Sequence, residues 1–456
     1  MPRRPARRSR GATEQTRQPC ILIGIGRERS IGGIELVEQL GQALGPPPSL
    51  DEHPTGVVEL RGHVAGTFEL PDELFVDGDR DLSLRRHTKI LPTYGIRPSR
   101  LARSPAVSSG TDHRDELDLL TSPAGRELLR RLAGTEVSPD GELRLAAVLR
   151  REYPAELVTA ALAQHELRLR AATKFTRAGR MFFTRDGLEQ ASAEAVATHR
   201  AARFAATGAA RVADLCCGIG GDLIALAGGA EEVRGMDRDP VHTRMATLNA
   251  AAYGVDRAVS MHRADVRDVD LSGVDAVFVD PARRAGGRRL RTGDSEPPLD
   301  WCLALAARVR PVAIKAAPGL DRAAVPAGWE VEFVAEGREL KEAVLWSPAF
   351  ADGAQTRAET RVETRATVLP GPHQLLPAPG EPVPCRPPGS YLVDPNPAVT
   401  RAGLVEELGR ELGAWKIDSM IAFLSADRPP HTPFGRTLRV LDDGPWREKE
   451  LAARLR

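Results

Sequence analysis

A glycine-rich turn at residues 214–221 is the part of the sequence best suited to hold a ligand. The segment Asp214–Gly221 follows an apolar stretch and leads into a helical one, with glycines at positions 218, 220 and 221. Glycine lets the backbone pass close to a ligand and adopt positive φ values that other residues resist. The N-terminus of the next helix exposes free N–H groups. Dinucleotides and S-adenosylmethionine both bind at such turns.

The spacing of the glycines favours S-adenosylmethionine. A dinucleotide-binding turn would need glycine at positions 218, 220 and 223, and position 223 is a leucine. Asp214 precedes the glycines, where a carboxylate would repel a pyrophosphate but suits the cationic aminoacyl end of S-adenosylmethionine. Asp214, Gly218 and Gly220 are therefore predicted to bind this cofactor.

Acidic residues also end the second and third predicted strands. Asp237 can accept hydrogen bonds from two ribose hydroxyls, and Asp265 can reach the adenine amino group. The carboxyl ends of the strands are where ligands bind in open α/β sheets. With Asp214, these acids predict one cofactor pocket along that edge. Asp239, before Pro240, is interpreted instead as a helix N-cap.

The fourth predicted strand ends in Asp280 and Pro281, where the donor methyl group should point. Asp280 can accept a hydrogen bond from a substrate amine, and Pro281 fixes the turn. Both are predicted to be catalytic. Beyond them lies a basic cluster that would suit phosphate contacts, or would otherwise form a solvated loop: Arg283, Arg284, Arg288, Arg289 and Arg291.

Apolar strands alternate with helical patterns over residues 211–348, which predicts a doubly wound parallel sheet. Strands are expected at 212–216, 232–237, 259–265, 276–280, 312–316, 331–335 and 343–346. Helices are expected at 221–227, 240–253 and 299–308. A hairpin-like break at 337–339 predicts that the last two strands run antiparallel.

The rest of the chain divides by composition and periodicity. Residues 1–113 are an N-terminal extension expected to be poorly ordered or marginally folded, with a short strand at 21–26 and a short helix at 33–44. Residues 114–205 form a helical lead-in, and 206–350 form the sheet domain. Residues 351–388 contain an exposed strand at 356–368 and a Pro-rich linker. Residues 389–456 predict a small α+β domain, with a helix at 404–412 and strands at 420–424 and 438–441.

Composition excludes several classes. The 63 Lys and Arg nearly balance the 62 Asp and Glu, so net charge does not indicate a nucleic-acid partner. No run of 18 apolar residues predicts a membrane helix, and no long apolar segment follows the N-terminal arginines, so no membrane or secretory location is expected. The five cysteines show neither zinc-ligand spacing nor a disulfide framework. A cytoplasmic protein without metal is predicted.

Three blocks, Asp214–Gly221, Arg234–Pro240 and Val279–Arg283, resemble class I methyltransferases. Met181–Arg185 and Leu188–Ala191, with Pro395–Val399 and Thr432–Arg436, resemble bacterial members that carry a C-terminal THUMP-like domain. The core is also similar to the trimethylguanosine-synthase branch. The resemblance implies a Rossmann-like sheet, S-adenosylmethionine as cofactor and an RNA partner, and it implies that Phe183 and Thr184 contact the cofactor.

One departure from the family pattern affects the substrate. Amino-methylating relatives place a proline and an aromatic residue where this chain has Ala282 and Arg283. An arginine plane can substitute for the aromatic ring in base stacking. The leading hypothesis is N-methylation of an RNA base. The alternatives are a degenerate methyltransferase that binds RNA or protein, and a methyltransferase with a non-RNA substrate.

Overall fold

The computed structural model describes residues 19–23, 112–135, 139–282, 284–285, 288–289, 295–350 and 363–445. The chain divides into two compact units. The nine-stranded unit spans residues 88–378 and 397–404, and the five-stranded unit spans 1–87, 379–396 and 405–456. Apart from 19–23 and 112–113, the predicted N-terminal extension lies outside the described residues.

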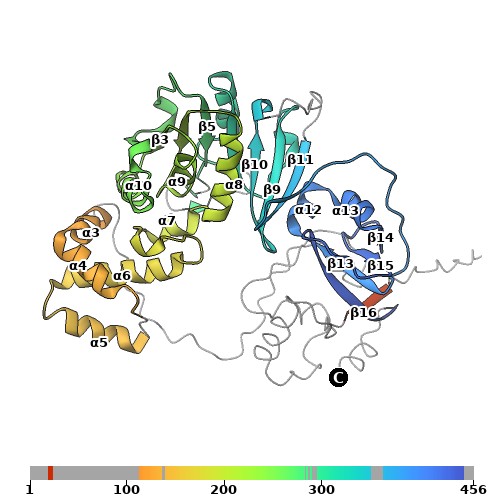
Figure 1. The fold of residues 1–456 in the computed structure, drawn as a ribbon, viewed down its shortest axis with the longest axis horizontal. Helices are drawn as coiled ribbons and strands as arrows, with labels where there is room; N and C mark the ends of the chain where they lie inside the picture. The colour runs from red at the N-terminus through yellow and green to blue at the C-terminus, as the bar shows by residue number, and fades with distance from the viewer. Residues whose placement is uncertain are drawn as a thin grey trace, which may run out of the picture. The chain divides into compact units, whose positions relative to one another are not determined.

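A mixed sheet forms the centre of the nine-stranded unit (Figure 1). Its order is β12-β11-β9-β10-β8-β5-β2-β3-β4, and the five strands from β8 to β4 run parallel. The parallel strands are β2 (Arg211–Leu215), β3 (Glu232–Asp237), β4 (Val259–Arg263), β5 (Ala276–Val279) and β8 (Val312–Ala316). The others are β9 (Glu330–Glu336), β10 (Glu339–Trp346), β11 (Glu363–Leu369) and β12 (His373–Leu375). The predicted α/β class and Rossmann-like sheet are confirmed.

The antiparallel pairing of the last two predicted strands is also confirmed, because β9 and β10 form a hairpin. A strand is expected at 356–368 with its side chains exposed, and the predicted exposure is wrong. The observed strand β11 begins at Glu363, pairs in parallel with β9, and buries its last four residues. Its polar residues are accommodated because the buried Thr367 donates a hydrogen bond to Glu332. Residues 356–362 lie outside the described part.

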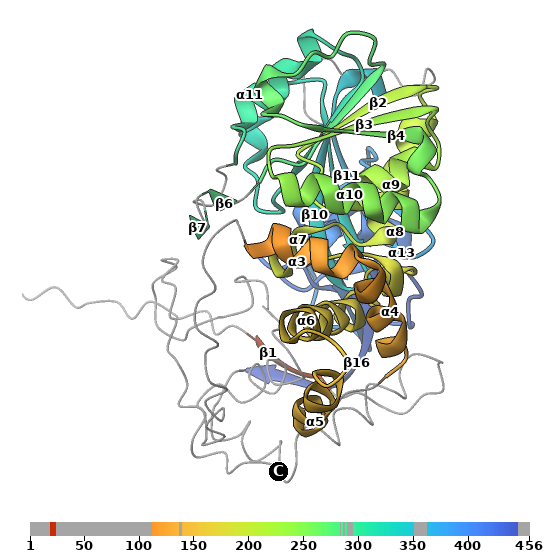
Figure 2. The ribbon, with the colours of Figure 1, turned by 90° about the vertical axis from the view of Figure 1, so that its left-hand side faces the viewer.

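Helices pack beside the sheet (Figure 2): α8 (Glu194–Ala205), α9 (Gly221–Ala227), α10 (Pro240–Tyr253) and α11 (Leu299–Ala304). The predicted bounds of α9 and α10 are exact, and the predicted helix at 299–308 is α11 extended by a 3₁₀ turn at 305–307. Aromatic rings join α8 to the sheet. The ring centroids of Phe204 and Phe350 lie 5.0 Å apart, and those of Trp346 and Phe350 lie 4.7 Å apart.

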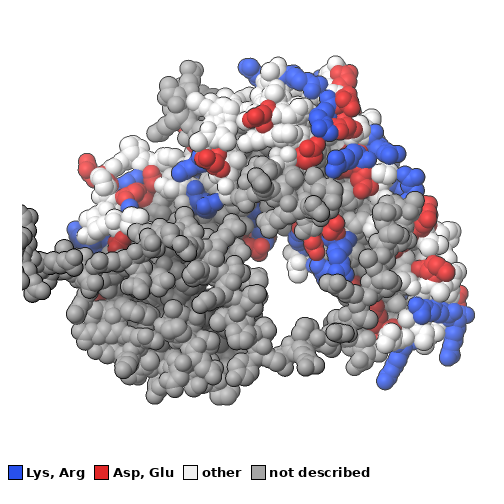
Figure 3. All heavy atoms as spheres, turned by 180° about the vertical axis from the view of Figure 1, so that it is seen from behind, with Lys and Arg blue, Asp and Glu red and all other residues white. Residues whose placement is uncertain are grey.

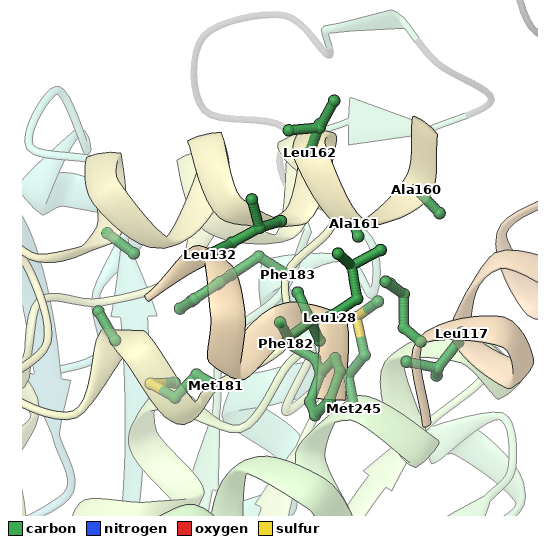
Figure 4. Packing of buried hydrophobic residues seen from close by; sticks show 14 of the residues in the cluster. Leu117, Leu128, Leu132, Ala160, Ala161, Leu162, Met181, Phe182, Phe183 and Met245 are labelled. Atoms are coloured by element: carbon green, nitrogen blue, oxygen red, sulfur yellow. The ribbon is translucent and has the colours of Figure 1, made fainter. Parts of the chain in front are cut away.

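The helical lead-in contains α3 (Asp112–Thr121), α4 (Pro123–Leu132), α5 (Pro139–Leu149), α6 (Ala155–Ala171) and α7 (Arg185–Gln190). Its core is a cluster of leucines, including Leu117, Leu128 and Leu132. Figure 4 shows that Phe182 and Phe183, which precede α7, and Met245, which belongs to α10, lie in the same cluster. The lead-in and the sheet helices therefore share one hydrophobic core, which fixes the segment at 181–184 next to α10.

The five-stranded unit is built on an antiparallel sheet in the order β1-β16-β13-β15-β14. The strands are β1 (Pro19–Ile23), β16 (Gly435–Pro445), β13 (Tyr391–Pro395), β15 (Leu424–Ala426) and β14 (Trp415–Lys416). The helix α13 (Val405–Leu412) and β16 confirm two predicted elements. The strand expected at 420–424 is wrong, because Met420 is 77% exposed and β15 begins only at Leu424. Helix α12 (Pro397–Ala402) belongs to the nine-stranded unit and packs against β9 and β11.

Candidate functional site

The glycine-rich turn connects β2 to α9 through left-handed backbone. Cys216, Gly218 and Gly220 have φ values of 61°, 54° and 88°. Cys216 is the sole non-glycine with positive φ in the described residues, which marks local strain. A Cβ on Gly220 would lie 3.1 Å from the Cβ of Ala246. Glycine at 220 therefore serves both the backbone conformation and the close approach of α10.

Asp237 holds this turn against the end of β3. Its Oδ2 accepts a hydrogen bond from the backbone N–H of Gly218 (2.9 Å), and its Oδ1 accepts one from Asp239 (2.8 Å). Each carboxylate oxygen keeps further acceptor capacity, as ribose hydroxyls require. Asp239 accepts from the N–H groups of Val241 and His242, which confirms its interpretation as the N-cap of α10.

Asp214 is fully buried, and neither of its carboxylate oxygens has a hydrogen-bond partner in the described part of the chain. Burial, followed by the charge of nearby Asp280, raises the pKa of Asp214 well above its usual range. A buried acceptor without a donor is costly unless a ligand supplies one. The ammonium of S-adenosylmethionine is such a donor, so the residues present fit this cofactor.

Asp265 accepts hydrogen bonds from the backbone and side chain of Arg267. The Arg267 Nε and Nη2 atoms lie 2.9 and 2.6 Å from its oxygens. These hydrogen bonds lower the pKa of Asp265 to about 2. The carboxylate is ionised and partly exposed, as an adenine contact requires, but it would have to share its oxygens with Arg267.

Asp280 follows β5 directly and lies beside the end of β2, where its N–H donates to the Leu215 carbonyl (3.1 Å). Its Oδ2 accepts a hydrogen bond from Lys315 Nζ (2.7 Å), and its Oδ1 bonds to no described residue. Pro281 is buried, and the backbone of Ala282 pairs with Glu296. The turn is thus fixed from both sides while one carboxylate oxygen stays available.

The predicted phosphate-binding arginines fall mostly outside the described residues. Arg283 is outside them entirely, and for Arg284 and Arg288 only the backbone is described. That backbone forms a short antiparallel pair, β6 (Arg284–Ala285) with β7 (Arg288–Arg289), visible in Figure 2. The role of these arginines remains a prediction.

Thr184 begins α7 as its N-cap, with its hydroxyl accepting from the N–H of Gly187 (2.9 Å). The buried Asn249 ties Phe182, two residues before Thr184, to the glycine-rich turn. Its Oδ1 accepts from the N–H of Phe182 (2.7 Å), and its Nδ2 donates to the carbonyls of Phe182 (3.0 Å) and Ile219 (2.9 Å). The lead-in segment therefore borders the turn, although the cofactor contact of Thr184 remains a prediction.

Sequence reasoning missed a set of buried polar residues behind Asp280. Lys315 ends in the site, and Ser192, Asp222 and Arg200 continue from it into the interior. One signal was available: Lys315 interrupts an otherwise apolar strand, β8, near its carboxyl end. The partners of Lys315 come from distant segments, and no local pattern announces them.

The described residues contain no cluster of three or more side chains that could hold a metal ion. In that part of the chain, no helix is long and apolar enough to cross a membrane. Burial raises the pKa values of the Cys216 and Cys217 thiols, which disfavours the nucleophilic thiolate form.

Comparisons with known proteins agree with this geometry. Residues 209–297 match the model of the RNA cap guanine-N2 methyltransferase family, and residues 112–171 match a domain family of unknown function. The chain is 39% identical over 276 residues to an uncharacterized S-adenosylmethionine-dependent methyltransferase of Mycobacterium tuberculosis, represented in two strains. That match covers 59% of this chain and 72% of the relative.

A solved structure of a candidate methyltransferase from Porphyromonas gingivalis W83 has the same fold, with a TM-score of 0.52 at 21% identity. The superposition covers 72% of this chain and 80% of the other. Sheet order, the glycine-rich turn with its acids, and close sequence identity agree. S-adenosylmethionine is therefore the cofactor, and the chain belongs to the class I S-adenosylmethionine-dependent methyltransferases.

Proposed function

We propose that the protein transfers the methyl group of S-adenosylmethionine to an amino nitrogen of an RNA base. The observation that carries this proposal is Asp280. One of its oxygens is held by Lys315, and the other bonds to no described residue, so it can accept an N–H from a substrate amine. The match of residues 209–297 to the RNA cap guanine-N2 methyltransferase model supports an RNA base as the acceptor.

The cofactor residues have distinct proposed roles. Asp214 accepts from the cofactor ammonium, Asp237 accepts from the ribose hydroxyls, and Asp265 accepts from the adenine amino group. Gly218 and Gly220 let the backbone approach the cofactor, because they carry no Cβ and have positive φ. Thr184 completes the pocket from the lead-in side.

The bound cofactor supplies an electrophilic methyl group on a sulfonium. The chain contributes alignment, which is the main source of acceleration when the electrophile is already reactive. Asp280 Oδ1 accepts one N–H of the amine and so orients the nitrogen lone pair, and it can take up the proton that the methylated nitrogen releases. Pro281 holds the backbone of this turn.

Residues 389–456 are proposed to be a THUMP-like domain that engages RNA, and the core is proposed to belong to the trimethylguanosine-synthase branch. Lys and Arg are interspersed with Asp and Glu over the coloured part of the face in Figure 3, so that part of the surface gives no uniform basic field. RNA affinity must then come from local contacts, for which Arg283, Arg284 and Arg288 are proposed. Such contacts make binding weaken as salt rises.

The test uses radiolabelled S-adenosylmethionine and total RNA from a strain in which the gene is deleted. The parent protein is expected to label RNA, and nucleoside mass spectrometry is expected to find one N-methylated base. Asp280→Asn is expected to bind the same RNA and to label it at least about 100-fold more slowly. Absence of label in RNA, with label appearing in protein or small-molecule extracts, would exclude the RNA proposal and leave the methyltransferase assignment intact.

A further inference from the structure

A buried chain of polar side chains leads from Asp280 into the interior. Lys315 Nζ donates to Asp280 Oδ2 (2.7 Å) and to Ser192 Oγ (3.1 Å). Ser192 Oγ in turn donates to Asp222 Oδ2 (2.8 Å), and Asp222 pairs with Arg200. Each of these four side chains comes from a different element or loop, so folding alone brings them to Asp280.

Lys315 is unusual in this protein. The sequence has six lysines among its 63 basic residues, and of those that the structure describes Lys315 is the buried one, 7% exposed. Burying an ammonium is costly unless it is paired and hydrogen-bonded. Arg200 at the far end is 1% exposed and also pairs with Glu342, so the set carries two buried cations close to the site.

We propose that Lys315 is a positioning residue for methyl transfer: it holds Asp280 by Oδ2, so that Oδ1 is the oxygen offered to the acceptor amine, and it balances the charge of Asp280 beside the donor methyl. The inference rests on the proposed function, which puts the acceptor at Asp280. Ser192 and Asp222 fix the direction of the Lys315 ammonium. Arg200, whose guanidinium lies 4.6 Å from the Phe278 ring centroid, anchors the set in the core.

This role has a consequence that does not depend on the substrate. S-adenosylmethionine carries a cationic sulfonium, and its product S-adenosylhomocysteine is neutral at sulfur. Removing the Lys315 charge leaves Asp280 unbalanced, which attracts the cationic cofactor more than the neutral one. Neutralising Asp280 has the opposite effect. A residue that merely supports the fold would change both affinities by the same factor.

The experiment measures both affinities by calorimetry on the full chain for the parent, Lys315→Met, Asp280→Asn and the double variant. The cofactor preference is the ratio of the affinity for S-adenosylmethionine to that for S-adenosylhomocysteine. Lys315→Met is expected to raise this ratio roughly threefold or more, the size expected of a nearby unit charge in a partly screened site. Asp280→Asn lowers the preference, and the double variant returns it close to the parent value. Lys341→Met, which removes an ammonium paired with Glu339 and Glu336, serves as the matched control and leaves the preference unchanged.

Lys315→Arg covers the case in which the methionine variant fails to fold. It keeps the charge but not the geometry of a single ammonium. The cofactor preference is expected to match the parent, while methyl transfer to RNA falls. A preference that is unchanged in Lys315→Met, or that shifts in Lys315→Arg as it does in Lys315→Met, would overturn the proposal.

The activity arm uses the same total RNA. Lys315→Met is expected to lower transfer at saturating substrate by roughly 10- to 100-fold in the parent background and by less than about threefold in Asp280→Asn, because the lysine acts through Asp280. Equal losses in both backgrounds would contradict this. If the parent transfers no methyl group to RNA, the proposed function fails, and the cofactor preference still decides the role of Lys315.

Discussion

Two carboxylates in the nine-stranded unit, Asp214 and Glu332, have the same burial and opposite surroundings. Both are 0% exposed. Glu332 on β9 accepts hydrogen bonds from His199 (2.7 Å), from Arg203 and the Trp346 indole (2.9 Å each), and from the Thr367 hydroxyl. Asp214 on β2 accepts none from any described residue.

Their pKa values move in opposite directions. Burial alone would raise the pKa of Glu332, but the hydrogen bond from His199 and the charge of Arg203 hold it well below its usual range. Burial and the charge of Asp280 raise the pKa of Asp214. Glu332, which accepts hydrogen bonds from four protein side chains, joins α8 to β9, β10 and β11 and stabilises the fold. Asp214, which accepts no hydrogen bond from a described residue, lies at the glycine-rich turn and is proposed to bind the cofactor.

The largest expected effect is a loss of methyl transfer on replacing Asp280, which lies near Asp214. Replacing Asp280 with Asn removes the charge that is proposed to orient the amine and accept its proton, so methyl transfer to RNA is expected to fall about 10²- to 10⁴-fold. Affinity for S-adenosylhomocysteine stays within a few-fold. Asp270→Asn, at an exposed carboxylate bonded to Ser272, is the matched control and keeps full activity. A comparable loss of methyl transfer in Asp270→Asn would show that the loss in Asp280→Asn is not specific to the site.

Glu332→Gln tests whether the buried, fully hydrogen-bonded Glu332 stabilises the fold. Neutralising it removes the buried anion that accepts from His199 and leaves Arg203 with Glu330 as its remaining buried partner, which is expected to lower the free energy of unfolding by about 3 kcal/mol. Urea unfolding measures this, with Glu339→Gln as the control at an exposed ion pair. Cofactor affinity per folded molecule is expected to stay the same. A loss below about 1 kcal/mol would show that Glu332 does not support the fold as described.

Asp214→Asn is expected to do the reverse and stabilise the cofactor-free protein by about 1 kcal/mol at neutral pH, since it removes a carboxyl group whose ionisation is disfavoured by burial. An acid whose pKa is raised by folding binds its proton more tightly in the folded state. The parent therefore loses stability as pH rises from the usual aspartate range through the raised pKa, and the variant lacks this slope. Thermal melts between pH 4 and 8 measure both; parallel curves would contradict the expectation.

The smallest effect concerns the N-terminal residues. Deleting residues 1–113 removes β1, which pairs with β16 in the five-stranded unit, whereas every proposed cofactor residue lies in the nine-stranded unit. Affinity for S-adenosylmethionine is expected to stay within about twofold by calorimetry. A folded deletion variant that loses cofactor binding would show that the extension contributes to the pocket.

The sequence predicted the parallel sheet well because its strands are short apolar runs with acids or glycines directly after them. The bounds of β3, α9 and α10 were predicted correctly because such residues mark where these elements begin and end. It failed at β11, whose alternating Thr, Arg and Glu resemble a solvent-facing strand. Glu330 and Glu332 on β9 satisfy those polar residues inside the protein, and such long-range pairing has no local signature.

The same distinction holds at the site. Asp214, Asp237, Asp265 and Asp280 lie at strand ends and could be named from spacing alone. Whether each carboxylate is satisfied, shared or unpartnered depends on the hydrogen-bond partners that folding supplies. Asp237 is bonded to Gly218, 19 residues earlier, and Asp280 to Lys315, 35 residues later, whereas Asp265 is engaged by Arg267, two residues away. Lys315 and Arg200 were not identified because their importance arises only from the partners that folding brings to them.

The most direct test of the cofactor site is calorimetry with S-adenosylmethionine on Asp237→Ala and its neighbour Asp239→Ala. Asp237 is proposed to accept hydrogen bonds from the ribose, so its loss is expected to weaken binding by about 1–3 kcal/mol. Asp239 caps α10, so its loss is expected to lower stability while affinity stays within about twofold. Equal affinities for the parent and Asp237→Ala would contradict the placement of the cofactor along this edge of the sheet.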